Sequence, residues 1–334
     1  MSEGPAHWLP LHPLAGARGN GGSRAFADLP TTSNADRSYS SPAPTVSVET
    51  ARGCRGSQAA TRSAQCTNNE SIIMIRPLTS NDLHEAAQLT TGDRNALLAH
   101  LRWQLHTPYA SAFVLQNGPE VVGVACCIRH ALSAHIGHVF IHPQHRRKHL
   151  GSALVQHLLT HCEANGCATT SAQVPEADLP FWQAQGFNPH GRYVRFSGGL
   201  HIDAGRDEVL LLEPQHTLAL LHLDQRATGE DRRALLLEHR FVAHVYADQG
   251  HVRGGMLPLL GHGLVLADSP AVGLELQRWL LPHQQHIVVP EANATACAHL
   301  IERTYIPEHA GVRMVRGPLL PYRPELIYGW PWGL

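Results

Sequence analysis

The sequence predicts an α+β protein with two consecutive domains that share one order of elements. The chain of 334 residues is 43% hydrophobic and 16% charged, enough to bury one large core or two medium ones. From residue 73 on, short apolar runs alternate with amphipathic stretches of helical period. One series of elements ends near residue 197 and a second, similar series starts near Asp207, which indicates an internal duplication.

Residues 1–70 differ in composition from the rest of the chain. They are rich in Ser, Thr, Gly, Pro and Ala and show neither helical nor strand periodicity. Such a segment buries too little apolar surface to offset the entropy of ordering it, so we expect it to be disordered. The pattern changes at SIIMIRPLTSNDLHEAAQL, where an apolar strand precedes Ser80 or Asn81 as a helix N-cap. Met74 stands at this boundary and is a candidate for the true initiator.

The first predicted domain covers residues 72–197. After the first strand we expect helices at 81–90 and 93–106, strands at 111–116, 120–129 and 136–142, a helix at 149–165, a strand at 168–174, a helix at 178–185 and a strand at 191–197. The segment QNGPE between two apolar runs is typical of a hairpin turn. Gly166 stands where a C-cap would release the chain from a helix into the next strand.

The second predicted domain covers residues 207–334, after a linker at 198–206. We expect a strand at 208–214, helices at 217–227 and 229–240, a strand at 241–247, strands at 252–259 and 263–267, a helix at 270–281, a strand at 286–289, a helix at 292–303 and strands near 312–317 and 326–329.

Charge and composition exclude several classes of protein. A formal net charge of −1 argues against a non-specific nucleic-acid binder, which needs a basic surface. No apolar run approaches the roughly 20 residues that span a bilayer, and the N-terminus lacks the layout of a signal peptide. Seven cysteines without a CxxC pair fit neither a disulfide framework nor a zinc ribbon. We therefore expect a cytoplasmic protein with reduced thiols and neither a nucleic-acid nor a membrane partner.

The 25 histidines raise the question of a metal site. His157 and His161 are four residues apart on one predicted helix, next to Cys162. A structural zinc site needs about four converging ligands, and no second cluster with ligand spacing completes the set. We predict no metal and interpret these histidines as exposed helix residues.

One segment of the first domain indicates a ligand. HPQHRRKHLGSALVQHLLTHCE, residues 142–163, combines clustered positive charge, one glycine and an apolar-periodic helix. The first four N–H groups of a helix lack internal partners, and the helix dipole places partial positive charge there. An anion is the expected guest, and phosphate is the leading candidate.

The same segment carries a resemblance to a known family. HVFIHPQHRRKHLGSALVQHLL, followed after a strand by LPFWQAQGF, resembles the GNAT family of N-acetyltransferases over about residues 72–197. The acyl-CoA motif of that family is met at Arg146 and Gly151, whereas His149 stands where the family usually has glycine. The resemblance implies the GNAT fold, a mixed and mostly antiparallel sheet flanked by helices. The second half resembles the GNAT-like C-terminal domain of two-domain acetyltransferases through LDQRATGEDRRALL, VPEANATACAHLIE and RGPLLPYRPELIYG. The resemblance therefore implies two tandem copies, the second of them degenerate.

The resemblance also implies that acetyl-CoA is the cosubstrate and where it binds. In the family, this turn and helix start hold the pyrophosphate through backbone N–H groups, and Gly151 would let the ligand approach the backbone. The strand before the loop is splayed from its neighbour, so its unpaired backbone groups bond the pantetheine arm. The residues assigned to cofactor binding are Val139, Phe140, Ile141, Arg146, Arg147, Lys148, His149, Leu150, Gly151 and Ser152.

Catalytic candidates also follow from the resemblance. His135 takes the position of the glutamate base of the histone-acetylating branch, and an imidazole of ordinary pKa could serve near neutral pH. His135 is either that base or a bystander in a histidine-rich chain. The usual tyrosine acid is replaced by Trp182, which donates no proton at a useful pKa. Tyr193, water or no acid at all takes that role.

The second domain departs from the cofactor motif. After the strand GLVLA comes DSPAVGLELQ, with Asp268 and neither an arginine nor paired glycines. A carboxylate there suits an N-cap and repels phosphate, so we expect this copy to complete the substrate cleft or to mediate a homodimer. The predicted function is transfer of an acetyl group to a primary amine. The alternative is a module that binds acyl-CoA without turnover, since His149 and Trp182 depart from the family pattern.

Overall fold

The computed structural model describes residues 73–200, 204–205 and 207–331. The segment 1–70 predicted to be disordered lies outside these residues. The first half of the chain forms strands β1 (Ile73–Pro77), β2 (Ala110–Asn117), β3 (Glu120–Arg129), β4 (Ser133–Ile141), β5 (Thr169–Val174) and β6 (Asn188–Ser197), with helices α1 (Leu83–Ala87), α2 (Arg94–His106), α3 (Leu150–Ala164) and α4 (Leu179–Ala184).

The second half repeats strands and helices in a similar order. Its strands are β7 (Val209–Leu211), β8 (His244–Asp248), β9 (His251–Leu257), β10 (Leu264–Ala267), β11 (His286–Pro290), β12 (Ile306–Arg316) and β13 (Ile327–Gly329). Its helices are α5 (Pro214–Thr228), α6 (Arg233–Glu238), α7 (Pro270–Leu280) and α8 (Ala294–Glu302). The predicted α+β class with two copies of one fold is confirmed.

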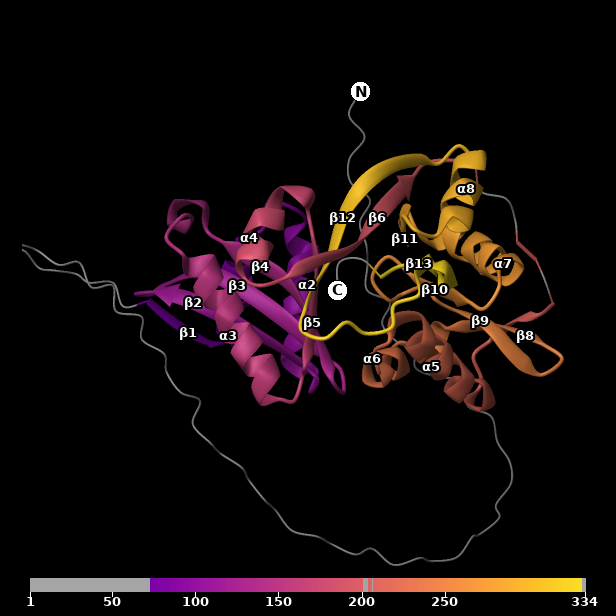
Figure 1. The fold of residues 1–334 in the computed structure, drawn as a ribbon. Helices are drawn as coiled ribbons and strands as arrows, with labels where there is room; N and C mark the ends of the chain where they lie inside the picture. Colours follow the sequence, from indigo (N-terminus) through magenta and orange to yellow (C-terminus); the bar gives the residue numbers. More distant parts are fainter. Residues whose placement is uncertain (1–72, 201–203, 206, 332–334) are drawn as a thin grey trace, which may run out of the picture. The chain divides into compact units, whose positions relative to one another are not determined.

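The strands of the described residues form two mixed or antiparallel sheets (Figure 1). The larger is 8-stranded, in the order β1-β2-β3-β4-β5-β12-β6-β11, and only its β4–β5 pair is parallel. The smaller is 5-stranded and antiparallel throughout, in the order β13-β10-β9-β8-β7. The single parallel pair is the place where the larger sheet opens, as described below.

Helices cover both faces of each sheet, and successive side chains of the central strands pack alternately against the two helix layers. In β3, Ala125 and Cys127 pack in the cluster that holds α3 and α4, whereas Val124 and Cys126 pack with α1 and α2. Successive strand side chains point to opposite faces, so a strand covered on both sides reads as the continuous apolar run VVGVACCI. In the second half, α5 and α6 cover one face and α7 and α8 the other.

The two halves share strands. β12, which belongs to the second half by sequence, pairs with β5 over Val312–Arg316 and with β6 over most of its length. β6, from the first half, pairs on its other side with β11. Figure 1 shows β6 and β12 running side by side within the larger sheet, from the side of β5 towards α8. The sequence pattern divides the chain near residues 198–206, a boundary that stays a prediction, whereas strand pairing crosses that point.

Several elements differ from their expected bounds, and two of these differences have clear local reasons. The helix expected at 229–240 is shortened to Arg233–Glu238, because Gly229 has a φ of 74° and ends α5 in a left-handed cap. The next residues form a turn instead. The strand expected from 312 begins at Ile306, because the segment from Ile306 pairs with the end of β6 at Ser197.

Residues 72–205 alone are expected not to fold cooperatively. That fragment lacks β12, whose Val312 and Met314 are only 2% and 0% exposed in the core of the first half. Each buried side chain of this size is worth roughly 1.5–3 kcal/mol, a large share of a typical total of about 5–15 kcal/mol. The check is to unfold the fragment and residues 72–334 with urea, to follow both by circular dichroism and to compare the two curves. A sigmoidal transition of the fragment at the midpoint of the longer chain would contradict it.

Candidate functional site

A large cleft opens where β4 and β5 part. Their parallel pairing covers Ser133–Ile136 and Thr169–Ala172, and beyond it β4 continues to Ile141 paired with β3 on one edge only. The cleft has a volume of about 1060 Å³ and is walled by the second half of β4, the loop into α3, the end of β5 and residues around α4. Strands that separate leave backbone groups unpaired along one edge, and such groups can bind an extended ligand.

A β-bulge marks the point of separation. Val124 of β3 faces Phe140, whereas Cys126 faces Gly137, so one residue of β3 opposes two of β4. His138 within the bulge has a φ of 53°. Its ring stacks on that of His100 from α2 at 4.1 Å, and its Nδ1 is buried with no hydrogen-bond partner among the described residues. The bulge therefore turns the outer half of β4 away from the regular ladder and towards the cleft.

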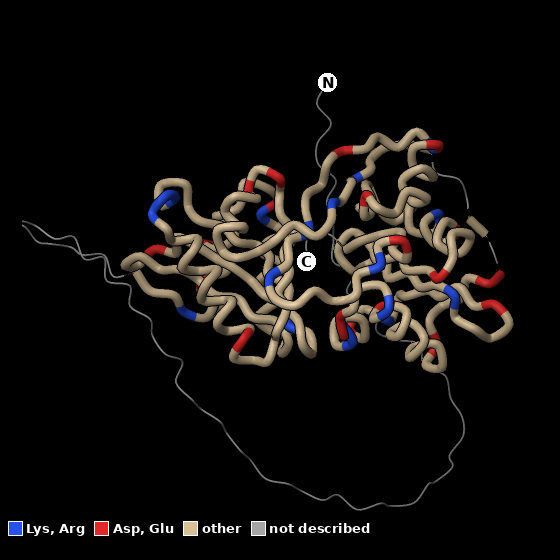
Figure 2. Tube along the Cα trace, viewed as in Figure 1, with Lys and Arg blue, Asp and Glu red and all other residues tan. Residues whose placement is uncertain are grey.

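The loop from β4 to α3 is rich in Lys and Arg (Figure 2), and its Arg146 and Arg147 line the cleft. Arg147 and His149 have φ angles of 61° and 59°, in the left-handed region, and His149 is the N-cap of α3. Successive N–H groups in such turns form a concave surface that binds anions. His149 stands in a conformation that favours glycine, which explains why the GNAT motif usually has glycine there.

Nine of the ten predicted cofactor residues line this cleft. They are Val139, Phe140, Ile141, Arg146, Arg147, His149, Leu150, Gly151 and Ser152. Lys148 is exposed and is not among the lining residues. Two side chains are held in place, because Arg146 donates from Nε to the carbonyl of Ile141 at 3.0 Å and Gln185 donates to Oγ of Ser152 at 3.1 Å.

The two catalytic candidates lie in different places. His135 lines the inner end of the cleft, and its Nδ1 is 3.2 Å from Oγ of Ser171. Burial and the neighbouring His130 and Arg313 lower the pKa of His135 to about 3, so its imidazole is neutral near pH 7. Tyr193 is fully buried in a core of the second half and does not line the cleft. Burial raises its pKa well above 10, and its hydroxyl contacts that of Tyr322 at 3.2 Å.

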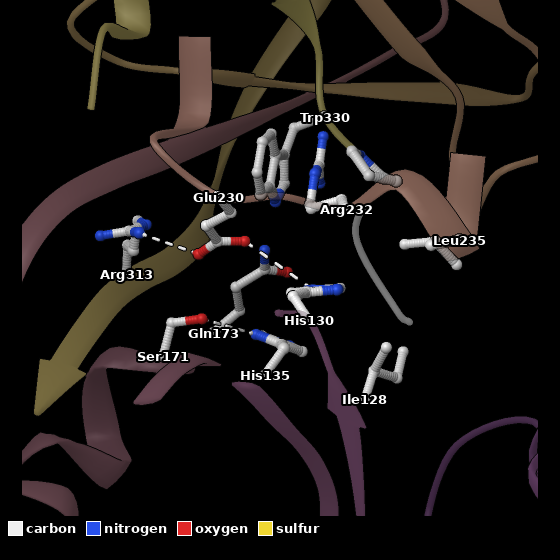
Figure 3. Close-up of a pocket in the computed structure, with 11 residues that line it drawn as sticks. Ile128, His130, His135, Ser171, Gln173, Glu230, Arg232, Leu235, Arg313 and Trp330 are labelled. Atoms are coloured by element: carbon white, nitrogen blue, oxygen red, sulfur yellow. Dashed lines mark hydrogen bonds and ion pairs between the residues drawn. The ribbon is translucent and has the colours of Figure 1, made fainter. Parts of the chain in front are cut away.

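A second, interior cavity adjoins the inner end of the cleft (Figure 3). It has a volume of about 30 Å³ and shares His135 and Gln173 with the cleft. Its other polar walls are His130 and Ser171 from the first half, and Glu230, Arg232, Arg313 and Trp330 from the second. The residues from the second half are far apart in sequence, so no local pattern predicts that they meet. Among them, Arg313 stands on β12, opposite Gln173 of β5.

The histidines of α3 pack against a strand. His157 and His161 are half-buried, and both rings contact Phe113 edge-on at 4.6 and 5.1 Å. The Nε2 of His161 is 3.2 Å from Oγ of Ser111. The expectation that they are exposed is wrong, because β2 passes under this face of α3. No group of three or more His, Cys, Asp or Glu side chains suited to a metal ion occurs in the described part of the chain.

In the second half the corresponding opening is filled. β10 and α7 follow each other as β4 and α3 do, but β13 pairs with β10, with Val265 opposite Gly329. The carbonyl of Tyr328 accepts from Nε2 of Gln277 in α7, and a Cβ at Gly273 would lie 2.3 Å from the Tyr328 ring. The last described residues of the chain thus occupy the place where a ligand would enter.

Asp268 does not cap α7, contrary to the sequence expectation. The N-cap is Ser269, and Asp268 accepts from Nε of Arg253 at 2.6 Å. The reason is that β9 lies beside β10 and places Arg253 within reach of the carboxylate.

Comparison with known proteins agrees with this geometry. Residues 79–187 match the model of the acetyltransferase (GNAT) family. The fold resembles a putative acetyltransferase from Pyrococcus horikoshii, with 18% identity, 81% of this chain and 98% of the other covered, and a TM-score of 0.68. It also resembles a GCN5-related N-acetyltransferase from Sphaerobacter thermophilus, with 16% identity, coverage of 75% and 98%, and a TM-score of 0.53. No sequence among the curated proteins matches the chain.

Residues 79–187 therefore form an acetyltransferase domain of the GNAT family, and the chain is a tandem of two GNAT folds. The family transfers acetyl groups from acetyl-CoA, its cosubstrate. Within the residues described, no helix is both long and apolar enough to cross a membrane.

Buried histidines make folding depend on pH. Burial is the main cause that lowers the pKa of six of them, to about 2 for His100, about 3 for His130 and His135, and about 4 for His138, His262 and His299. The unfolded chain binds protons at these groups below about pH 6.5 and the folded chain does not. Stability is therefore fully present above pH 6.5 and is lost as pH falls towards these lower values.

We expect the free energy of unfolding to fall steeply between pH 6.5 and 5. Each such histidine contributes a slope of up to about 1.4 kcal/mol per pH unit. His100→Phe keeps an aromatic ring against His138 and should reduce the slope by about that amount. Urea titrations at several pH values measure it. An unchanged slope in His100→Phe, or a flat wild-type profile, would contradict the prediction.

Proposed function

We propose that this chain is an N-acetyltransferase that moves the acetyl group of acetyl-CoA to a primary amine, with the reaction centre in the first half. The observation that supports this most is the single cleft that joins the β4 edge left unpaired by β5 to the basic start of α3. One end of that cleft suits a phosphate and the other an extended chain ending in an acyl group. The second half has the corresponding opening filled by β13, so we assign it a role in the acceptor site.

The α3 end of the cleft is suited to the pyrophosphate of acetyl-CoA. The left-handed turns at Arg147 and His149 and the free N–H groups of the first turn of α3 point to an anion. Gly151 provides the test of fit. A Cβ there would meet only ordinary contacts, with Phe181 at 3.5 Å and Ile141 at 3.6 Å. The protein itself has room for a side chain, so the glycine is needed for something that enters the cleft.

The chain's own residues then position the reactants. Backbone groups of Val139, Phe140 and Ile141 run along the open edge of β4 and would hold the pantetheine arm. Phe181 and Trp182 close the cleft on the side of α4 and limit access of water to the thioester. Orientation of two reactants in one cleft supplies a large part of the rate in reactions of this type.

The second candidate is a module that holds acyl-CoA without turnover. One observation that favours it is the left-handed backbone of His149 in the loop. The other is Trp182, which stands where the family usually has a tyrosine and whose indole N–H cannot act as an acid.

Release of CoA thiol decides between the two functions. The chain is mixed with acetyl-CoA and a panel of small amines, amino acids, aminoglycosides and peptides with free N-termini, at several pH values. We expect thiol release that depends on one class of amine and yields its acetylated product by mass spectrometry. Calorimetric binding of acetyl-CoA without thiol release on any amine would favour the module.

Gly151→Ala should separate cofactor binding from folding. Alanine stabilises a helix by up to about 1 kcal/mol relative to glycine at the same position, so the free energy of unfolding of the variant should be no lower than that of wild type. The added methyl group enters the cleft and should weaken acetyl-CoA binding roughly tenfold, which is about 1.4 kcal/mol.

The matched control is Thr160→Ala, an exposed position of the same helix away from the cleft. It should leave acetyl-CoA affinity unchanged in the same calorimetric titration. Equal affinities for wild type and Gly151→Ala would place the cofactor elsewhere.

A further inference from the structure

The interior cavity is the part of the molecule that the assigned site does not explain. It meets the cleft at His135 and Gln173, beside the point where β4 and β5 separate. A volume of about 30 Å³ holds water or a small polar group but no complete substrate. Whatever occupies it is therefore next to the reaction centre of the proposed function, on the side of the second half.

The cavity wall carries an acceptor and a donor that the protein leaves loosely bonded. The Glu230 carboxylate is 3.5 Å from Arg313 and 3.8 Å from His130, both long for direct hydrogen bonds, while its side chain is 8% exposed (Figure 3). Trp330 is 6% exposed, and its Nε1 has no hydrogen-bond partner among the described residues. A buried polar atom of this kind is costly unless a guest satisfies it. The pair suits water, which both donates and accepts.

The two arginines beside Glu230 have other partners as well, and these contacts leave the cavity open. Arg232 forms a buried bidentate pair with Asp224, so that cation is already satisfied. Arg313 also contacts Nδ1 of His190 at 3.1 Å and lies over the Tyr322 ring at 4.6 Å. The charged and titratable groups that face Glu230 from the surrounding elements are His130, His135, Arg313, Arg232, Asp224, Tyr193 and Tyr322.

Among the groups that line the cavity, Glu230 is the one suited to take up a proton. A proton on His130 or His135 would create a new buried cation beside Arg232 and Arg313, and burial holds the pKa of both imidazoles near 3. A proton that moves from an ammonium group to a carboxylate removes two opposite charges instead, which a low-dielectric site favours.

We propose that Glu230, contributed by the second half of the chain, accepts the proton of the acceptor ammonium group through water held in this cavity. The inference rests on the proposed function. The ammonium loses one proton to Glu230, which later releases it to solvent. The free amine nitrogen forms a bond to the acetyl carbon as the carbon–sulfur bond breaks, and the electron pair stays on sulfur. The nitrogen gives its surplus proton to the thiolate, so one proton is released in total.

The test compares pH profiles on the amine that the panel identifies. Glu230→Gln should lower kcat/KM for that amine on the order of 10²-fold near neutral pH, with acetyl-CoA affinity unchanged. The deficit should shrink as pH approaches the pKa of the amine, because a free amine needs no proton acceptor before attack. A role in packing alone would produce a loss that does not vary with pH.

Glu275→Gln is the matched control, since Glu275 is also a buried carboxylate of the second half paired with an arginine, Arg278, and it does not line the cavity. It should keep the wild-type profile. If Glu230→Gln does not fold, the double variant Glu230→Gln/Arg313→Gln removes both charges of the pair and should show the same pH-dependent deficit.

A deficit that is constant with pH, or one that Glu275→Gln shares, overturns the proposal. Failure of the proposed function gives a different result, because wild type would then release no thiol on any amine, and the role of Glu230 would fall with it.

Discussion

The pairing of β12 with β5 and β6 is the interaction on which the rest of this molecule depends. It inserts a strand from the second half into the sheet of the first, and its Val312 and Met314 complete the core under α3 and α4. The same strand brings Arg313 to the wall of the interior cavity. Because this strand supplies both core and cavity side chains, the interior cavity is complete only when β12 is paired with the first half.

The two copies differ in what lies beside the strand that precedes the long helix. In the first half, the bulge at His138 turns β4 out of register and leaves its outer half free along the cleft. In the second half, β13 pairs with β10, and the Tyr328 ring packs on Gly273 of α7. An open strand edge and a basic helix start suit a nucleotide cosubstrate, whereas a paired edge with a packed aromatic ring leaves it no room. The two copies of the fold therefore differ at this place, since the first half has an open cleft there and in the second half β13 fills the corresponding position.

Several histidines of this protein serve as neutral aromatic side chains packed among other residues. His100 and His138 stack on each other, and His130 and His135 lie at the interior cavity. Burial lowers the pKa of these groups, so they contribute hydrogen-bonding capacity without charge near pH 7. This arrangement leaves Glu230 and the arginines as the charged groups of the cavity wall, and it makes the folded state sensitive to acid.

The sequence by itself determined the class of fold, the order of elements and the position of the basic loop that we propose as the cofactor site. Alternating or continuous apolar runs reveal strands, and Arg146, Gly151 and the helix that follows are neighbours in the chain, so local pattern was sufficient. Tertiary structure alone decided which strands the halves share, that His157 and His161 pack on Phe113, and that Asp268 pairs with Arg253. It alone joined His135 to Glu230, Arg313 and Trp330. These contacts link residues far apart in sequence, and pairing between distant strands leaves no periodic signal in the segments that it brings together.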